Sequence, residues 1–221
     1  MIRPNRVPSP GSQRPLPRSA GRALGVLALS AVLAGLTACA LPERAARPAS
    51  YDFGPDVTAA SAPAASATAL LALADVEAPP SLDGTAMLYR LAYADGREAR
   101  PYAQSRWSMP PAQLVRQRLR ARLGEARVVV SVGEAPAAQT LRVELEEFSQ
   151  VFEAPQQSAG LVRLRVTLVD AGSPASPRVR QRSFVAQRPA PTADAAGGVR
   201  ALAAATEAVV EEIVQWVRAA P

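Results

Sequence analysis

The chain has 221 residues, 48% of them hydrophobic, which suffices for one buried core with dispensable ends. Its formal net charge of +6 at pH 7 is concentrated at the N-terminus, because five of the 25 arginines precede Cys39 and no acidic residue does. The remaining 20 arginines and 19 acidic residues nearly balance, which argues against nucleic acid as a partner, since that binding depends on many cationic contacts to phosphates.

Residues 1–38 are predicted to be an export signal peptide. A basic segment without acidic residues, 1–22, precedes an apolar run that begins at Ala23. That run has about 15 residues, fewer than the roughly 20 that a membrane-spanning helix needs. A permanent transmembrane helix is therefore the weaker interpretation.

The end of this run carries a pattern for lipid attachment. Leu36-Thr37-Ala38-Cys39 resembles the bacterial lipobox, in which small residues admit the signal peptidase and the cysteine thiol receives diacylglycerol. Because Cys39 is the only cysteine, we predict cleavage before it and a lipid anchor on it, with acyl chains such as palmitate. The alternative is an ordinary secretory signal that is cut nearby, with Cys39 as a free thiol.

The segment 39–68 is predicted to be a lipidated tether. Ala, Pro and Ser dominate it, and it shows neither a helical nor a strand period. Ala40 follows the cysteine where an Asp would resemble an inner-membrane retention signal of enteric bacteria, so we predict the periplasmic face of the outer membrane. A cluster with two aromatic residues and a turn signal, Tyr51 to Pro55, is expected to dock on the domain or on a partner.

Residues 69–221 are predicted to form one domain that is rich in strands. Apolar residues and turn signals place strands at 71–76, 87–93, 102–107, 128–130 and 178–186. The clearest alternation of apolar and polar residues marks two further strands, at 141–145 and 162–168.

These two strands form an amphipathic pair. If they are antiparallel neighbours, Glu144 and Glu146 face Arg163 and Arg165 across the strands. The adjacent acids Glu146 and Glu147 shift the alternation, which indicates a bulge or the end of a strand.

Two amphipathic helices are predicted. The first begins at Pro110-Pro111 and ends at Gly124, and the second carries an apolar stripe from Val199 to Val217. The stripe is expected to cover the sheet instead of forming a docking surface. Sequential strands with two interspersed helices predict an α+β fold, with a mainly antiparallel sheet and both helices packed on one face.

The composition argues against catalysis. There is no histidine, so Ser-His-Asp triads, Cys-His pairs and His-ligated metal sites are excluded. Carboxylate chemistry needs two acids that converge on one cleft, and neither Glu146-Glu147 on a strand nor Glu211-Glu212 on a helix is expected to do so. We therefore predict no enzyme activity, no cofactor and no metal site.

Two further features are open to a binding role. Arg116, Arg118, Arg120 and Arg122 on the first helix either contact anionic head groups or an acidic partner or, as we expect, spread around a solvated face. Trp107 is either an edge of the core or an anchor of an interface.

The order of several short segments resembles a known family. The segments are Tyr89-Arg90-Leu91, Arg100 to Trp107, Pro110-Pro111 with its helix, Leu145 to Phe152, Ser158 to Leu168, and Gly198 through Trp216. Together they are similar to the ABC-type transport auxiliary lipoprotein component family, of which the paraquat-inducible lipoproteins are relatives. The similarity covers Tyr51 to Trp216.

This resemblance implies a non-catalytic, lipid-anchored component of a system that moves lipids or hydrophobic compounds across the bacterial envelope. The implied partners are a periplasmic protein with a mammalian-cell-entry (MCE) domain and an ABC permease with its ATPase, and homo-oligomerisation stays open. The alternative is an assembly or pilot lipoprotein for another envelope complex. A lipid carrier is least favoured, because one sheet and two helices leave little room for a cavity.

Overall fold

The structure is a computed structural model that describes residues 47–55, 70–170 and 178–219. All of these residues belong to one compact unit, Arg47–Pro221. The predicted signal peptide, Cys39 and most of the predicted tether lie outside the described residues.

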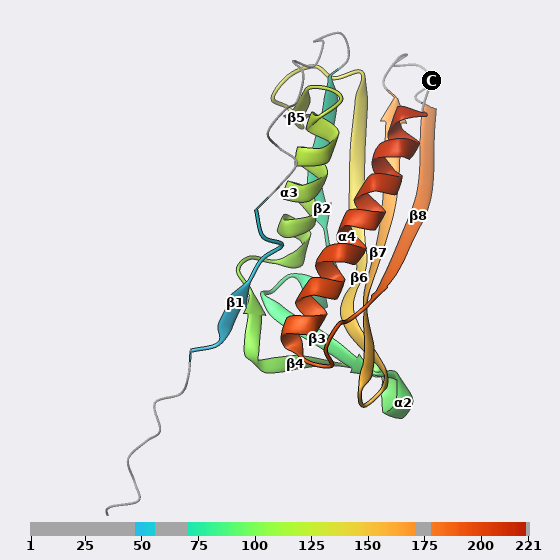
Figure 1. Ribbon diagram of the computed structural model, residues 1–221. Coiled ribbons are helices and arrows are strands. Elements are labelled where there is room, and N and C mark those ends of the chain that lie inside the picture. The colour runs from blue at the N-terminus through green and yellow to red at the C-terminus, as the bar shows by residue number, and fades with distance from the viewer. Residues whose placement is uncertain (1–46, 56–69, 171–177, 220–221) are drawn as a thin grey trace, which may run out of the picture. The chain divides into compact units, whose positions relative to one another are not determined.

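The described residues form one eight-stranded sheet with helices packed on it (Figure 1). The strands are β1 (Ala49–Tyr51), β2 (Leu71–Glu77), β3 (Ala86–Leu91), β4 (Gly96–Trp107), β5 (Val129–Ser131), β6 (Gln139–Ala154), β7 (Gln157–Asp170) and β8 (Arg178–Pro189). The helices are η2 (Pro80–Leu82), which is a short 3-10 helix, α2 (Ala92–Asp95), α3 (Pro111–Gly124) and α4 (Ala195–Arg218).

The sheet is mixed, so the α+β class is confirmed but the prediction of a mainly antiparallel sheet is wrong. Four of the seven strand pairings are parallel, namely β1–β4, β2–β5, β2–β6 and β3–β6. Alternating polarity identifies a strand and its buried face, but it does not encode the direction of the neighbouring strand. Parallel neighbours also need a long crossover, and the chain provides one between β2 and β5 that contains α3.

Strand β6 holds the sheet together. Along one edge it pairs antiparallel with β7 over nearly its whole length. Along the other edge its first half pairs with β2 and its second half with β3, both in parallel. On this side of β6 the sheet divides into two branches (Figure 1). In one branch β2 pairs with β5, and in the other β3 pairs with β4, which pairs with β1.

The long hairpin of β6 and β7 confirms the predicted amphipathic pair. Glu144 lies directly opposite Arg165, and the register shifts between Leu145 and Glu147, where a bulge was predicted. The apolar side chains on one face, such as Leu145 and Leu164, have no exposed surface. The other face carries the charged residues.

Helices α3 and α4 lie side by side on the buried face of the sheet (Figure 1). Helix α4 packs on β6, β7 and β8, and Leu202, Val209 and Ile213 on its stripe are fully buried, so the stripe forms core as predicted. A Cβ on Gly160 would lie 2.5 Å from the Leu202 backbone nitrogen, so only glycine permits the close approach of α4 to β7. Within the described ranges, no helix combines the length and apolarity needed to cross a membrane.

Candidate functional site

The aromatic cluster after the predicted lipid anchor docks on the domain. Strand β1 pairs in parallel with β4, with Tyr51 opposite Trp107. The backbone nitrogen of Ser108 donates a hydrogen bond of 2.7 Å to the Tyr51 carbonyl oxygen. This strand lies inside the range predicted to be a tether and was not itself predicted.

Phe53 completes this contact. Its ring centroid lies 5.9 Å from that of Trp107 and 6.2 Å from that of Phe148, and the Arg118 guanidinium lies 5.9 Å above the Phe53 ring. Trp107 is only 1% exposed, so it is part of the core and not an interface anchor. We name this contact, Tyr51 and Phe53 against β4 and α3, the N-terminal clip.

The arginine series on α3 makes contacts within the domain. Arg116 forms an ion pair with Asp75 (3.1 Å), Arg118 with Glu207 (2.8 Å), and Arg122 with Glu125 (2.6 Å) and Glu211 (2.8 Å), while Arg120 donates to Ser131 and to the Val129 carbonyl. Arg118 is itself buried, with 9% of its surface exposed. The expectation of a solvated face is therefore wrong, because α4, β2 and β5 supply the partners.

The adjacent carboxylates do not converge on a cleft. Glu146 forms an ion pair with Arg165, and Glu147 forms one of 3.1 Å with Arg90. The hydrogen bond from Arg122 holds the pKa of Glu211 below its usual value. In the part of the chain that the structure describes, no group of three or more His, Cys, Asp or Glu is placed to hold a metal ion.

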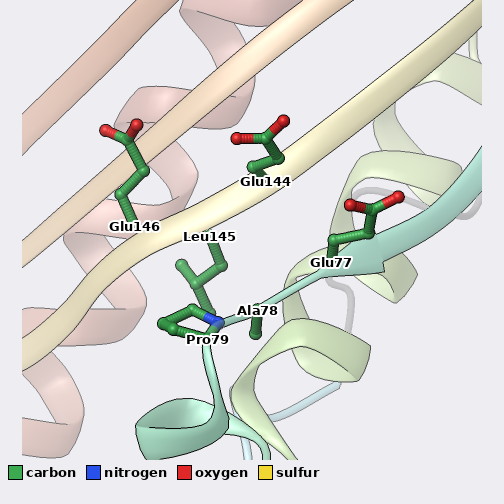
Figure 2. Close-up of a pocket in the computed structure, with 6 residues that line it drawn as sticks. All are labelled: Glu77, Ala78, Pro79, Glu144, Leu145 and Glu146. Atoms are coloured by element: carbon green, nitrogen blue, oxygen red, sulfur yellow. The ribbon is translucent and has the colours of Figure 1, made fainter.

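A pocket of about 380 Å³ opens where the sheet divides beside β6 (Figure 2). Its lining residues are Glu77, Ala78, Pro79, Glu144, Leu145 and Glu146. Glu77 lies opposite Glu144 in the register of β2 and β6, so two like charges are neighbours. Figure 2 shows Glu144 and Glu146 leaving β6 on one side and Leu145 on the other. The carboxylate oxygens of the pocket can accept hydrogen bonds from a cationic group.

Another hollow, of about 500 Å³, shares Glu77 with this pocket. It is lined by charged residues, among them Arg116 and Arg142, and by apolar ones such as Val132 and Val169. Val132 is 60% exposed. Neither hollow brings together residues that the sequence singled out as a site.

A set of three hydrogen-bonded polar side chains near the start of α4 was not predicted from the sequence. The Tyr102 hydroxyl donates to the side-chain oxygen of Gln150 (2.9 Å), and the Gln150 amide donates to the Ser158 hydroxyl (2.8 Å). Burial raises the pKa of Tyr102 to about 12. A Cβ on Gly198 would lie 2.0 Å from the Gln150 oxygen, so the group fixes the docking of α4. The signal in the sequence is a glutamine between Phe148 and Phe152 on the apolar face of β6.

Two solved structures share this fold. A crystal structure of a Xanthomonas campestris protein is 18% identical, with a TM-score of 0.57, and the match covers 80% of this chain and 88% of that one. A crystal structure of an uncharacterized protein is also 18% identical, with a TM-score of 0.61, and the match covers 78% of this chain and 99% of that one. No curated protein matches the chain.

The family comparison agrees with the order of the segments in the sequence. Residues 51–214 match the model of the family described as ABC-type transport auxiliary lipoprotein component. The match begins at the N-terminal clip and ends in the last turns of α4, so it spans the folded unit. This family is named for an auxiliary and not for a catalytic component. The chain belongs to the ABC-type transport auxiliary lipoprotein component family.

Proposed function

We propose that the chain is a non-catalytic, lipid-anchored component of an ABC transport system with an MCE-domain protein, which moves lipids or hydrophobic compounds across the bacterial envelope. The observation that carries the proposal is the family match over residues 51–214. In this proposal, the domain docks the periplasmic partner at the outer membrane. The partner ATPase supplies the energy.

The proposed anchor is Cys39, carrying diacylglycerol. The lipobox pattern at the end of the apolar run supports it. Strand β1 begins at Ala49, so only nine residues separate the anchor from this strand. Nine residues reach at most about 30–32 Å, roughly a third of what the whole segment 39–68 can reach. The anchor would therefore hold the domain close to the bilayer.

The test is a crosslinking pull-down of the full-length protein from native envelopes, with a Cys39→Ala form beside it. We expect an MCE-domain protein to be recovered with the anchored form and to be lost or reduced with the unanchored form. Recovery of secretion or pilus components alone would reject the transport role in favour of an assembly lipoprotein. If both forms were retained equally in the membrane, the proposed lipid anchor on Cys39 would be rejected.

The outer-membrane location has its own test. In an enteric host, Ala40→Asp places an acid directly after the lipidated cysteine, and we expect the protein to move to the inner-membrane fraction of a density gradient. Ala40→Ser is the matched control and is expected to stay with the outer membrane. An unmodified protein that is already in the inner-membrane fraction would reject this location.

A further inference from the structure

Strand β8 forms a long and regular edge of the sheet. It pairs with β7 over 12 consecutive positions, from Ala159 opposite Pro189 to Asp170 opposite Arg178, without a shift in register. Within the described ranges, β7 is its only partner strand, and it lies at the border of the sheet in Figure 1. Natural sheets protect an edge strand by shortening or bulging it, by proline or by charged side chains, and β8 carries charged side chains. Here the only proline is the last residue.

The edge of β8 that faces away from β7 presents a row of backbone groups that pair with no described strand. The Ala190 nitrogen donates to the Ser158 carbonyl (2.8 Å), and these two residues continue the register of the pair. In an antiparallel pair such positions alternate, so the even-numbered residues of β8 bond to β7. Positions 179, 181, 183, 185 and 187 therefore direct their N–H and C=O groups away from the sheet.

One face of this edge is basic. Arg178, Arg180 and Arg182 alternate along β8 on the same side as the buried Phe184. None of them forms an ion pair with a described residue, and β8 contains no acid. The Arg180 guanidinium lies 5.7 Å from the Trp216 ring and that of Arg182 lies 4.8 Å from the Phe184 ring. These ring contacts hold two of the arginines on the face of β8 against which α4 packs.

The opposite face of β8 is uncharged. Val179 is 60% exposed and Val185 is 49% exposed, and Gln181 and Ser183 lie between them. A strand added beside β8 would cover both valines. In the added strand, apolar residues on the side of the valines would have to alternate with residues on the side of the arginines.

We propose that the free edge of β8 binds an extended, acidic segment of a partner protein, which adds to the sheet as a further strand. Acidic side chains at alternating positions would lie beside Arg178, Arg180 and Arg182, and apolar ones beside Val179 and Val185. A second copy of β8 does not fit, because two rows of arginines would repel each other. The proposal rests on the docking role proposed above and names its surface and the chemistry of the bound segment.

The test measures the binding of a fluorescent peptide to the full-length lipoprotein in detergent by anisotropy. The peptide has 12 residues, as β8 has, and glutamate alternates in it with valine or threonine. We expect it to bind at least about tenfold more tightly than a peptide of equal composition with its glutamates clustered at one end. Equal binding of the two peptides, or no binding, overturns the proposal.

Two variants separate backbone pairing from simple charge attraction. Ser183→Pro removes one outward N–H and leaves the bonds to β7 intact, so we expect a loss of affinity of about tenfold or more, with Ser183→Thr as the matched control. The pair Arg180→Glu and Arg182→Glu is expected to lose affinity as well, whereas Arg97→Glu on β4 is not. Normal binding by a folded Ser183→Pro protein overturns strand addition.

The same variant distinguishes this proposal from the proposed function. If Ser183→Pro still captures the MCE-domain protein from envelopes as the unmodified protein does, the β8 proposal fails and the transport role stands. If sedimentation shows that the unmodified protein self-associates and Ser183→Pro does not, a second copy occupies the edge and the acidic segment is rejected.

Discussion

At the scale of single residues, Gly160 is a position where the backbones of two elements, β7 and α4, lie too close together for a side chain. A Cβ there would meet the backbone of Ala201 at 2.6 Å as well as that of Leu202. We expect Gly160→Ala to lower the free energy of unfolding by about 1–3 kcal/mol, measured by urea denaturation with circular dichroism. Gly124→Ala is the control, because nothing lies within 4 Å of the added carbon. Equal midpoints for the two variants would contradict the packing argument.

Asp194 precedes α4, and its protonation at low pH is expected to destabilise the start of this helix. Its carboxylate accepts hydrogen bonds from the Gly197 nitrogen (2.7 Å) and the Thr192 hydroxyl (2.7 Å). These bonds, the first above all, lower the pKa of Asp194 in the folded state. The stabilisation is therefore complete above the unfolded pKa of about 4 and is lost as the pH falls through the lower folded value.

The matching experiment compares thermal midpoints of the unmodified protein, Asp194→Ala and Asp194→Asn. The alanine variant is expected to melt at a lower temperature at pH 7, and its deficit should shrink as the pH falls below about 4. Asparagine keeps an acceptor for the helix start, so its deficit should be smaller and should not vary with pH through this group. If the melting temperature of Asp194→Ala stayed equally far below that of the unmodified protein down to pH 2, the charge of Asp194 would not contribute to stability.

At the scale of elements, ion pairs connect α3 to α4. The Arg122 and Glu211 side chains keep 24% and 43% of their surface exposed, whereas Asp75, the partner of Arg116, is 90% exposed. A double-mutant cycle with alanine at Arg122 and Glu211 should give a coupling of about 0.3–1 kcal/mol, and the cycle at Arg116 and Asp75 close to zero. Larger coupling in the exposed pair would reverse this ranking.

The elements were predictable where local periods define them. Both long helices, the β6–β7 hairpin and its bulge at Glu146-Glu147 follow from alternation and spacing. Strand β1 has three residues, too few for a period. The pairing of β2 with β6 joins segments more than sixty residues apart, and no local pattern encodes such a partner.

The same reason limits prediction of the candidate site. Glu77 and Glu144 become neighbours only through the parallel pairing of their strands. The arginines of α3 were misinterpreted because their partners belong to other elements, such as Glu207 on α4. Cys39, by contrast, is predicted from four adjacent residues and stays a prediction, because it lies outside the described residues.

At the scale of the whole molecule, the N-terminal clip decides how much of the chain is folded onto the domain. We expect Phe53→Ala to cost about 1–2 kcal/mol, less than a fully buried phenylalanine, and to release β1. Hydrogen exchange by mass spectrometry should then be faster in residues 47–55 and unchanged in β7. Tyr93→Ala, at a ring that is 49% exposed, is the control. Unchanged exchange in β1 would mean that Phe53 does not hold the clip.

The position of β6 also has a kinetic consequence. Strands β2 and β3 lie more than sixty residues before their partners on β6, so both parallel pairings require the closure of long loops. The β6–β7 hairpin closes over a two-residue turn, and we expect it to form first, because short loops close at the least entropic cost. Truncating Val143 in the hairpin should therefore slow folding, while truncating Leu71 in β2 should mainly speed unfolding.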